Sequence, residues 1–156
     1  MTRRVLSLAL ALAAVFSLPP QAHAQINPGL HVARATDSFG GVNGVGGSLQ
    51  LGLPALPVDL FFAGEYFFPN CDDCSFWGGS ADVHLTLPVP IVTPYAAAGL
   101  VLRNTDASDT RVRTGGLGLG AGLNLSTLVV GAYAEGRYEF MDGSGDQLVF
   151  RLGLRF

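Results

Sequence analysis

Apolar and polar residues alternate at a spacing of two along most of the chain beyond residue 25, which is the pattern of strands with one apolar face. The clearest case is the segment 148–156. Its apolar column is Leu148, Phe150, Leu152, Leu154 and Phe156, and the opposite column is Val149, Arg151, Gly153 and Arg155. Such a strand fits the core of a soluble β-protein, and it also fits a barrel in lipid, where the lumen is the polar side.

Eight segments show this pattern. The predicted strands are 29–36, 45–53, 58–68, 76–87, 94–102, 116–125, 128–140 and 148–156. The alternation is weakest in 29–36, and 58–68 is hydrophobic on both sides except at Asp59 and Glu65. The segment 116–125 is not expected to be helical, because each of its four glycines would cost a helix about 1 kcal/mol relative to alanine.

Two kinds of connection alternate between these segments. Connections after the first, third, fifth and seventh strands are polar and acidic, and they include 37–43 and the very polar 103–111. The others are short or bounded by proline. Long extracellular loops and short periplasmic turns are typical of outer-membrane barrels. We therefore expect an all-β fold, an eight-stranded antiparallel up-and-down transmembrane β-barrel whose closure removes the strand edges.

The N-terminus predicts export. A basic start at Arg3 and Arg4 precedes an apolar run over 5–18, two prolines, and small residues ending at Ala24. These are the parts of a secretory signal peptide cleaved between Ala24 and Gln25. The run is too short for a retained membrane helix. The expected organisation is a cleaved signal peptide over 1–24 and one barrel domain over 25–156.

Net charge and hydropathy restrict the kinds of partner and surroundings that the sequence predicts. Nine basic residues less Arg3 and Arg4 leave seven arginines against twelve acids, a formal charge of −5 for the mature chain, which argues against a nucleic-acid partner. The whole chain is 49% hydrophobic and 13% charged, with a mean hydropathy of +0.38, which is unusual for a soluble secreted protein.

Several short motifs resemble the small eight-stranded outer-membrane barrels, the OmpA-transmembrane, OmpX and OmpW group often called porin-like. They are Pro94-Tyr95-Ala96-Ala97-Ala98-Gly99-Leu100, the glycine alternation over 117–123, Glu135-Gly136-Arg137-Tyr138, and the terminal Phe156. The resemblance implies a Gram-negative cell envelope, contact with outer-membrane lipid, and a monomer. It also implies that Phe150, Leu152, Leu154 and Phe156 are a signal read by the barrel-assembly machinery.

Ten polar residues lie at those alternating strand positions that are predicted to point into the barrel. They are Gln50, Asp59, Glu65, Asp82, His84, Glu135, Arg137, Glu139, Arg151 and Arg155. An eight-stranded barrel is only just wide enough for its side chains to fill it, so we expect a lumen of paired charges. Arg137, Arg151 and Glu135 are expected to pair across the last two strands. The alternative is a narrow pore or a ligand cavity.

Cys71 and Cys74 form a C-x-x-C motif in an acidic loop. Redox catalysis favours this motif at a helix N-terminus, and a zinc site needs two further ligands that nothing nearby supplies. In an exported protein the motif predicts a disulfide. No metal and no cofactor are expected.

The leading functional hypothesis is an integral outer-membrane barrel, structural or a weak small-solute porin, without catalytic residues. The alternative is a soluble periplasmic or secreted barrel that binds an apolar ligand, favoured by Phe61, Phe67 and Tyr133. A third hypothesis is a lipid A acyl hydrolase, because His84 and Thr86 share a face. In such barrel enzymes the catalytic group faces lipid, whereas this pair has the polar parity.

Overall fold

The computed structural model describes residues 25–37, 40–53, 56–71, 74–87, 89, 91–107, 110–126, 130–143 and 145–156. The predicted signal peptide over 1–24 lies outside them. The strands are β1 (Gln25–Asp37), β2 (Gly40–Gly52), β3 (Val58–Phe67), β4 (Cys74–Thr86), β5 (Val92–Ala107), β6 (Thr110–Ser126), β7 (Gly131–Met141) and β8 (Gln147–Arg155). No helix in this part of the chain is long and apolar enough to cross a membrane.

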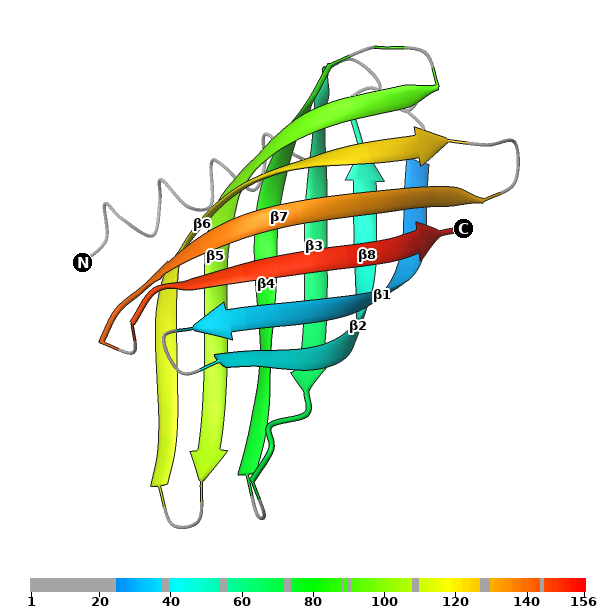
Figure 1. Cartoon of the computed structure of the whole chain (residues 1–156). Coiled ribbons are helices and arrows are strands. Elements are labelled where there is room, and N and C mark those ends of the chain that lie inside the picture. Colours follow the sequence, from blue (N-terminus) through cyan, green and yellow to red (C-terminus); the bar gives the residue numbers. More distant parts are fainter. Residues whose placement is uncertain are drawn as a thin grey trace, which may run out of the picture.

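The eight strands form one closed barrel in sequence order (Figure 1). Every strand pairs antiparallel with the next, and β1 closes the barrel on β8 with Val32 opposite Leu152. The predicted fold class is confirmed. We call the end with the connections after β1, β3, β5 and β7 the loop end. The opposite end, where β1 begins and β8 finishes, is the turn end.

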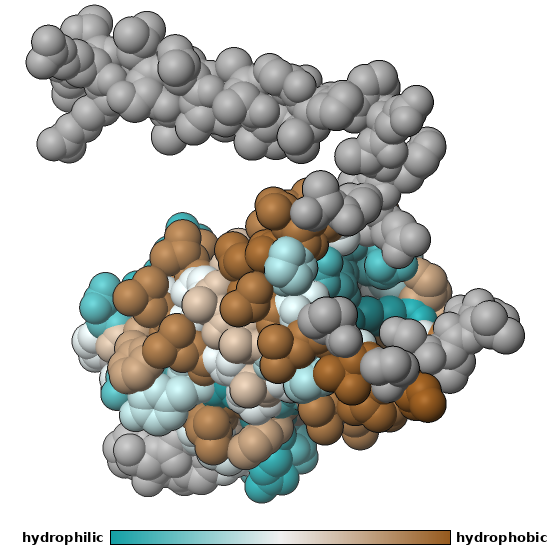
Figure 2. All heavy atoms as spheres, turned by 90° about the horizontal axis from the view of Figure 1, so that it is seen from above, coloured by the Kyte–Doolittle hydropathy of each residue, from teal (hydrophilic) through white to brown (hydrophobic). Residues whose placement is uncertain are grey.

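The alternation of the sequence becomes an inner and an outer face. Along β8, Arg151 is 2% exposed whereas its neighbour Leu152 is 62% exposed. The same alternation of buried and exposed residues runs along β3, β4 and β7. Apolar residues are spread over the outer surface in Figure 2. The apolar column of 148–156 therefore faces outward, and its charged column faces the lumen.

The β5–β6 hairpin is longer than the sequence pattern predicts, so the assignment of 103–111 to a loop is wrong. Asp106 lies opposite Arg111, and Asn104 lies opposite Arg113. Arg111 Nε is 2.6 Å from Asp106 Oδ1, and Arg113 Nε donates to Asn104 Oδ1 at 2.8 Å. Such cross-strand polar pairs stabilise a ladder as apolar pairs do. Figure 1 shows this hairpin extending past the β7–β8 hairpin.

The first hairpin is also longer than predicted. β1 begins at Gln25 rather than at residue 29, and β2 begins at Gly40. The predicted turn over 37–43 is largely wrong, because Thr36 pairs with Gly41 and Asp37 with Gly40.

The two ends differ in chemistry and not in connection length. The strand bounds leave two residues between β1 and β2 and two between β5 and β6, but five between β2 and β3. The expected contrast of long loops with short turns is therefore wrong, because the strands themselves extend toward the loop end. The contrast in charge remains: no charged residue occurs in the connections 53–57, 87–91 and 127–130.

Candidate functional site in the barrel lumen

Seven charged side chains fill the middle of the lumen, and we call them the ion cluster. Its members are Glu65 on β3, Asp82 on β4, Arg103 on β5, Glu135, Arg137 and Glu139 on β7, and Arg151 on β8. Each is 4% exposed or less. Charges buried to this degree are stable only when they are paired and hydrogen-bonded.

Arg151 connects three strands within the ion cluster. Its Nε lies 2.5 Å from Glu65 Oε1, and its Nη1 lies 2.7 Å from Glu135 Oε1. Glu135 is its register partner on β7. The Nη2 group donates to Ser80 Oγ at 3.3 Å. The pairing of Arg151 with Glu135 that the sequence predicts is present, and Glu65 extends it across the lumen to β3.

Arg103 was missed by the sequence reasoning, which placed it in an exposed loop. Its Nη1 donates to Glu65 Oε2 at 2.6 Å, and its Nη2 and Nε donate to the two carboxylate oxygens of Glu139 at 2.6 and 3.0 Å. Its guanidinium also lies 5.3 Å from the ring centroid of Phe67. The alternation along β5 could have revealed it. Every second residue from Tyr95 points into the lumen, and Arg103 is one of them.

Arg137 pairs differently from the prediction. Its Nη1 lies 2.5 Å from Asp82 Oδ2 on β4, and its Nε lies 3.3 Å from Glu139 Oε1. Arg137 was expected to take part in pairing across β7 and β8, but its partners are Asp82 on β4 and Glu139 on β7. β6 leaves room for it, because a Cβ at Gly118 would overlap the Arg137 guanidinium. The glycines of 116–125 that share this parity thus make space for large lumen side chains.

An aromatic layer lies in the lumen toward the turn end. The His84 ring is stacked between Phe61, at 4.6 Å between centroids, and Tyr95, at 4.5 Å. Tyr95 donates its hydroxyl to Glu135 Oε2 at 2.9 Å, which joins this layer to the ion cluster. The Arg155 guanidinium lies 4.2 Å from the ring centroid of Tyr133, and Arg155 Nη1 donates to Asn124 Oδ1 at 2.8 Å.

A second apolar layer lies on the loop side of the ion cluster. Phe67 and Phe76 stack at 4.7 Å between centroids, and Ala35 and Val149 pack with them. A vestibule of about 210 Å³ is lined by Phe76 of this layer and by Arg103, Met141 and Gln147. Side chains therefore fill the lumen at three successive levels.

The remaining polar residues predicted to face the lumen are also buried or half-buried. Gln50 Nε2 donates to Asp59 Oδ2 at 2.6 Å near the turn end. His31, which the sequence reasoning did not single out, places its Nε2 3.4 Å from Glu65 Oε1. Among the described residues no group of three His, Cys, Asp or Glu side chains is arranged to hold a metal ion.

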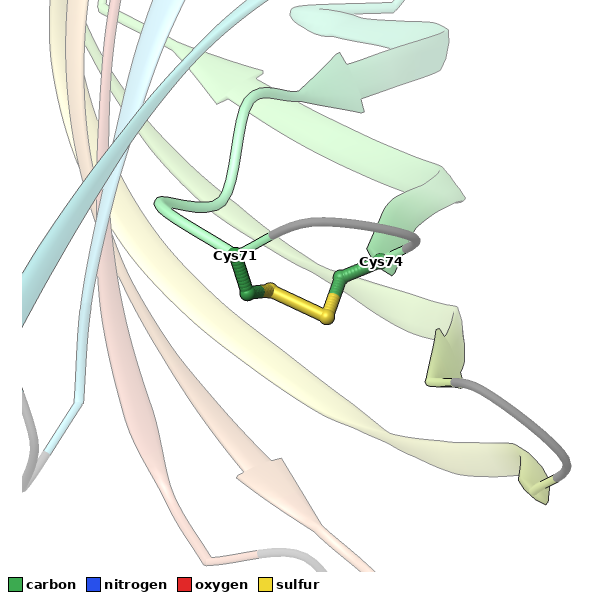
Figure 3. Close-up of a disulfide and its surroundings, with 2 residues drawn as sticks. All are labelled: Cys71 and Cys74. Atoms are coloured by element: carbon green, nitrogen blue, oxygen red, sulfur yellow. A yellow bond between two sulfur atoms is a disulfide. The ribbon is translucent and has the colours of Figure 1, made fainter.

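Cys71 and Cys74 form a disulfide at the loop end, in the connection from β3 to β4 (Figure 3). Their Cα atoms are 5.7 Å apart. Cys74 is the first residue of β4, so the bond joins the connection directly to the strand.

The residues assigned to the assembly signal lie on the outer face of β8 and directly after its last residue. Phe150, Leu152 and Leu154 alternate with buried lumen residues along β8, and Phe156 follows the strand with its side chain 58% exposed. The Phe156 backbone N–H donates to Pro28 O at 2.9 Å. All four side chains are accessible from the medium around the barrel.

No protein-family model and no curated protein matches the chain, but solved structures do. The N-terminal β-barrel domain of Pseudomonas aeruginosa OprF aligns at 20% identity over 86% of this chain and 100% of its own, with a TM-score of 0.64. Ail of Yersinia pestis aligns at 15% identity over 86% and 99%, with a TM-score of 0.62. Neisserial surface protein A aligns at 17% identity over 83% and 94%, with a TM-score of 0.58. The chain thus has the fold of the small eight-stranded outer-membrane barrels.

Proposed function

We propose that the chain is an integral protein of the bacterial outer membrane with a structural role and a closed lumen. The observation that carries this proposal is the inversion of polarity between the two faces of the barrel. Arg151 and its partners are enclosed, whereas Leu152 and the other apolar residues of the same strand point outward. A lumen of paired charges inside an apolar wall is the arrangement suited to hydrocarbon surroundings.

The outer surface is too apolar for water. Among the described residues, 28 large apolar or aromatic side chains are exposed around the barrel. Soluble monomers rarely expose contiguous apolar patches larger than roughly 300–600 Å². Transfer of this surface from water to lipid is favourable by about 25 cal/mol per Å².

Aromatic residues on the outer face mark one edge of the proposed membrane span. Tyr66, Trp77 and Tyr138 are exposed toward the loop end, and Tyr138 donates its hydroxyl to Asp146 Oδ2 at 3.0 Å. Amphipathic rings of this kind occur at membrane–water interfaces. We assign the loop end to the exterior and the turn end, with both termini of the barrel, to the periplasm, by analogy with the loops and turns of outer-membrane barrels.

A structural role is favoured over a porin by the filled lumen. The ion cluster lies between the Phe67–Phe76 layer and the Phe61–His84–Tyr95 stack. We expect a planar bilayer containing the protein to show no channel steps. Regular conductance steps from the wild type would instead support the weak-porin hypothesis.

Both alternatives fit the lumen less well. Of the residues that favour a soluble apolar-ligand barrel, Phe61 stacks on His84 and Phe67 stacks on Phe76, so both rings pack against other lumen side chains. A lipid A hydrolase needs its histidine at the lipid face, whereas His84 is fully enclosed between two rings. Thr86 donates its hydroxyl to Pro57 O at 3.3 Å.

Membrane fractionation combined with gel migration tests the proposal. The mature protein should appear in the outer-membrane fraction, and it should migrate differently before and after boiling in detergent, as a closed barrel does until heat unfolds it. We expect a monomer that interacts with the barrel-assembly machinery only during insertion. A chain that stays soluble without detergent would exclude the outer-membrane assignment.

A further inference from the structure

A groove on the outer face of the barrel combines an apolar floor with a basic end. It has a volume of about 660 Å³ and crosses β2, β1, β8, β7 and β6. Small residues at Ala121, Ala134 and Gly136 form its floor, and Phe150 and Leu152 form part of its sides. At the β2 side it reaches the exposed pair Arg34 and Asn43, where Arg34 Nη1 donates to Asn43 Oδ1 at 3.3 Å.

The groove is inclined along the barrel, because strand register sets its direction. Asn43, Arg34, Phe150, Gly136 and Ala121 are successive register partners across the five strands. Asn43 lies close to the loop end of β2, whereas Ala121 lies nearer the turn end of β6. The charged end of the groove is thus toward the loop end, and the apolar part descends toward the turn end.

Two other grooves on the outer face can be compared with this one by the charged residues that line them. One, of about 830 Å³, is lined by Phe62, Gly79, Leu100, Leu117 and the acidic Asp142. The other, of about 740 Å³, is lined on its outer face by apolar residues such as Leu30, Val45 and Leu154. Among these three grooves, only the one that reaches Arg34 includes an exposed cation.

We propose that this groove binds an anionic phospholipid, with the phosphate at Arg34 and an acyl chain over Ala134 and Gly136. The proposal rests on the proposed membrane location. A guanidinium presents five N–H donors in a geometry that suits phosphate oxygens, and one bond to Asn43 leaves others for the ligand. The alanine and glycine residues of the floor have no atoms beyond Cβ, so an acyl chain can lie close to the barrel wall. The inclination places the phosphate nearer the membrane surface and the acyl chain nearer the membrane interior, as in a bilayer leaflet.

Fluorescence quenching by brominated lipids tests the site directly. The chain contains one tryptophan, so a Trp77→Phe background with Phe150→Trp places a single reporter in the groove. The full barrel is reconstituted in phosphatidylcholine vesicles that contain either dibrominated phosphatidylglycerol or dibrominated phosphatidylcholine. We expect the reporter to favour phosphatidylglycerol about fivefold, since one basic residue near a membrane contributes about 1 kcal/mol. Arg34→Gln should reduce the preference to about one.

A matched reporter separates this site from a general attraction of the barrel for anionic lipid. Leu117→Trp in the same background lies in the groove with Asp142, and it should show no preference for phosphatidylglycerol. Equal preference at both reporters, or no preference at position 150 with Arg34 intact, overturns the inference. Absence of quenching by either lipid shows instead that the barrel is not in the bilayer, which overturns the proposed function.

Lipid retained through purification gives a second measurement. Gly136→Leu fills the groove floor, and a Cβ there makes ordinary contact with Phe150, at 3.4 Å from its Cε1. Gly115→Leu is the matched change in the comparison groove, where a Cβ lies 3.7 Å from Leu102 Cδ2. Native mass spectrometry should show loss of bound phosphatidylglycerol for Gly136→Leu and retention for Gly115→Leu. Equal retention in both variants contradicts the site.

Discussion

Arg103 on β5 donates two hydrogen bonds to the carboxylate of Glu139 on β7, a strand with which β5 does not pair. The same guanidinium also binds Glu65 on β3. Side chains thus connect strands that no backbone hydrogen bond joins.

Replacing Arg103 with leucine should destabilise the barrel strongly. Glu65 would lose one of its partners, and Glu139 would lose a bidentate one, in a buried environment. Removing one partner of a buried ion pair costs about 3–5 kcal/mol. Urea unfolding in detergent, followed by gel migration, measures the change. Arg111→Leu, which removes the exposed ion pair with Asp106, is the control, and it should cost less than about 1 kcal/mol. Equal losses for the two variants would contradict the buried network.

Removing an ion pair from the lumen should open a conducting path. The double variant Arg151→Ala with Glu135→Ala deletes register partners of opposite charge and leaves the net charge unchanged. We expect channel steps in planar bilayers from this variant and none from the wild type. Arg113→Ala with Asn104→Ala truncates a hydrogen-bonded pair outside the lumen and should stay silent. A silent lumen variant that is fully folded would show that the aromatic layers alone close the path.

Adding one methyl group at Gly118 should destabilise the barrel, whereas the same change at Gly64 should not. A Cβ at Gly118 overlaps the Arg137 guanidinium, which Asp82 and Glu139 hold in place. Overpacking of this kind costs about 1–3 kcal/mol. Gly64 faces outward with no atom within 4 Å of an added Cβ, so Gly64→Ala should change stability by no more than about 0.5 kcal/mol. Urea midpoints of the two variants provide the comparison, and similar midpoints would argue against a crowded lumen.

Reduction of the disulfide should have only a small effect on the folded barrel. The bond closes a loop with a sequence separation of 3, and the chain-entropy relation gives about 2 kcal/mol for so short a loop. Cys71→Ser with Cys74→Ser should therefore still insert and migrate as a folded barrel. Mass spectrometry with and without reductant verifies the bond in the wild type. Complete loss of folding in the double variant would mean that the bond is needed for assembly.

Phe156 is expected to matter for insertion more than for stability. Its side chain is exposed, and its backbone contact with Pro28 survives substitution, so Phe156→Ala should refold in detergent like the wild type. In cells the same variant should show less protein in the outer membrane. Phe140→Ala, an exposed aromatic change on β7, is the control with normal insertion. Equal membrane levels for both variants would remove Phe156 from the assembly signal.

The number, order and facing of the strands could be predicted from the sequence because alternation is a local property. Leu152 and Arg151 are neighbours, and their opposite polarity already assigns their faces. Strand ends were harder to predict, because Asp106 and Arg111 resemble loop residues until cross-strand pairing joins them.

Partners within the lumen depend on distances across the barrel, which the sequence does not contain. Arg151 and Glu135 are on adjacent strands, so their pairing was predictable. Arg137 and Asp82 are on β7 and β4, and their contact depends on the space that Gly118 leaves. Arg103 was missed because its sequence neighbours are polar, although its parity is inward.

The ion cluster draws none of its seven members from β1, β2 or β6. Under a pulling force, the ion cluster therefore links β3, β4, β5, β7 and β8 through the lumen in addition to their ladders, and the bond of Arg155 to Asn124 joins β6 to β8. The first hairpin instead relies mainly on its ladders to β3 and β8. The first hairpin is then the mechanically weakest part of the barrel. Forced extraction from the membrane would begin with the separation of β1 and β2, while the remaining strands stay connected to one another.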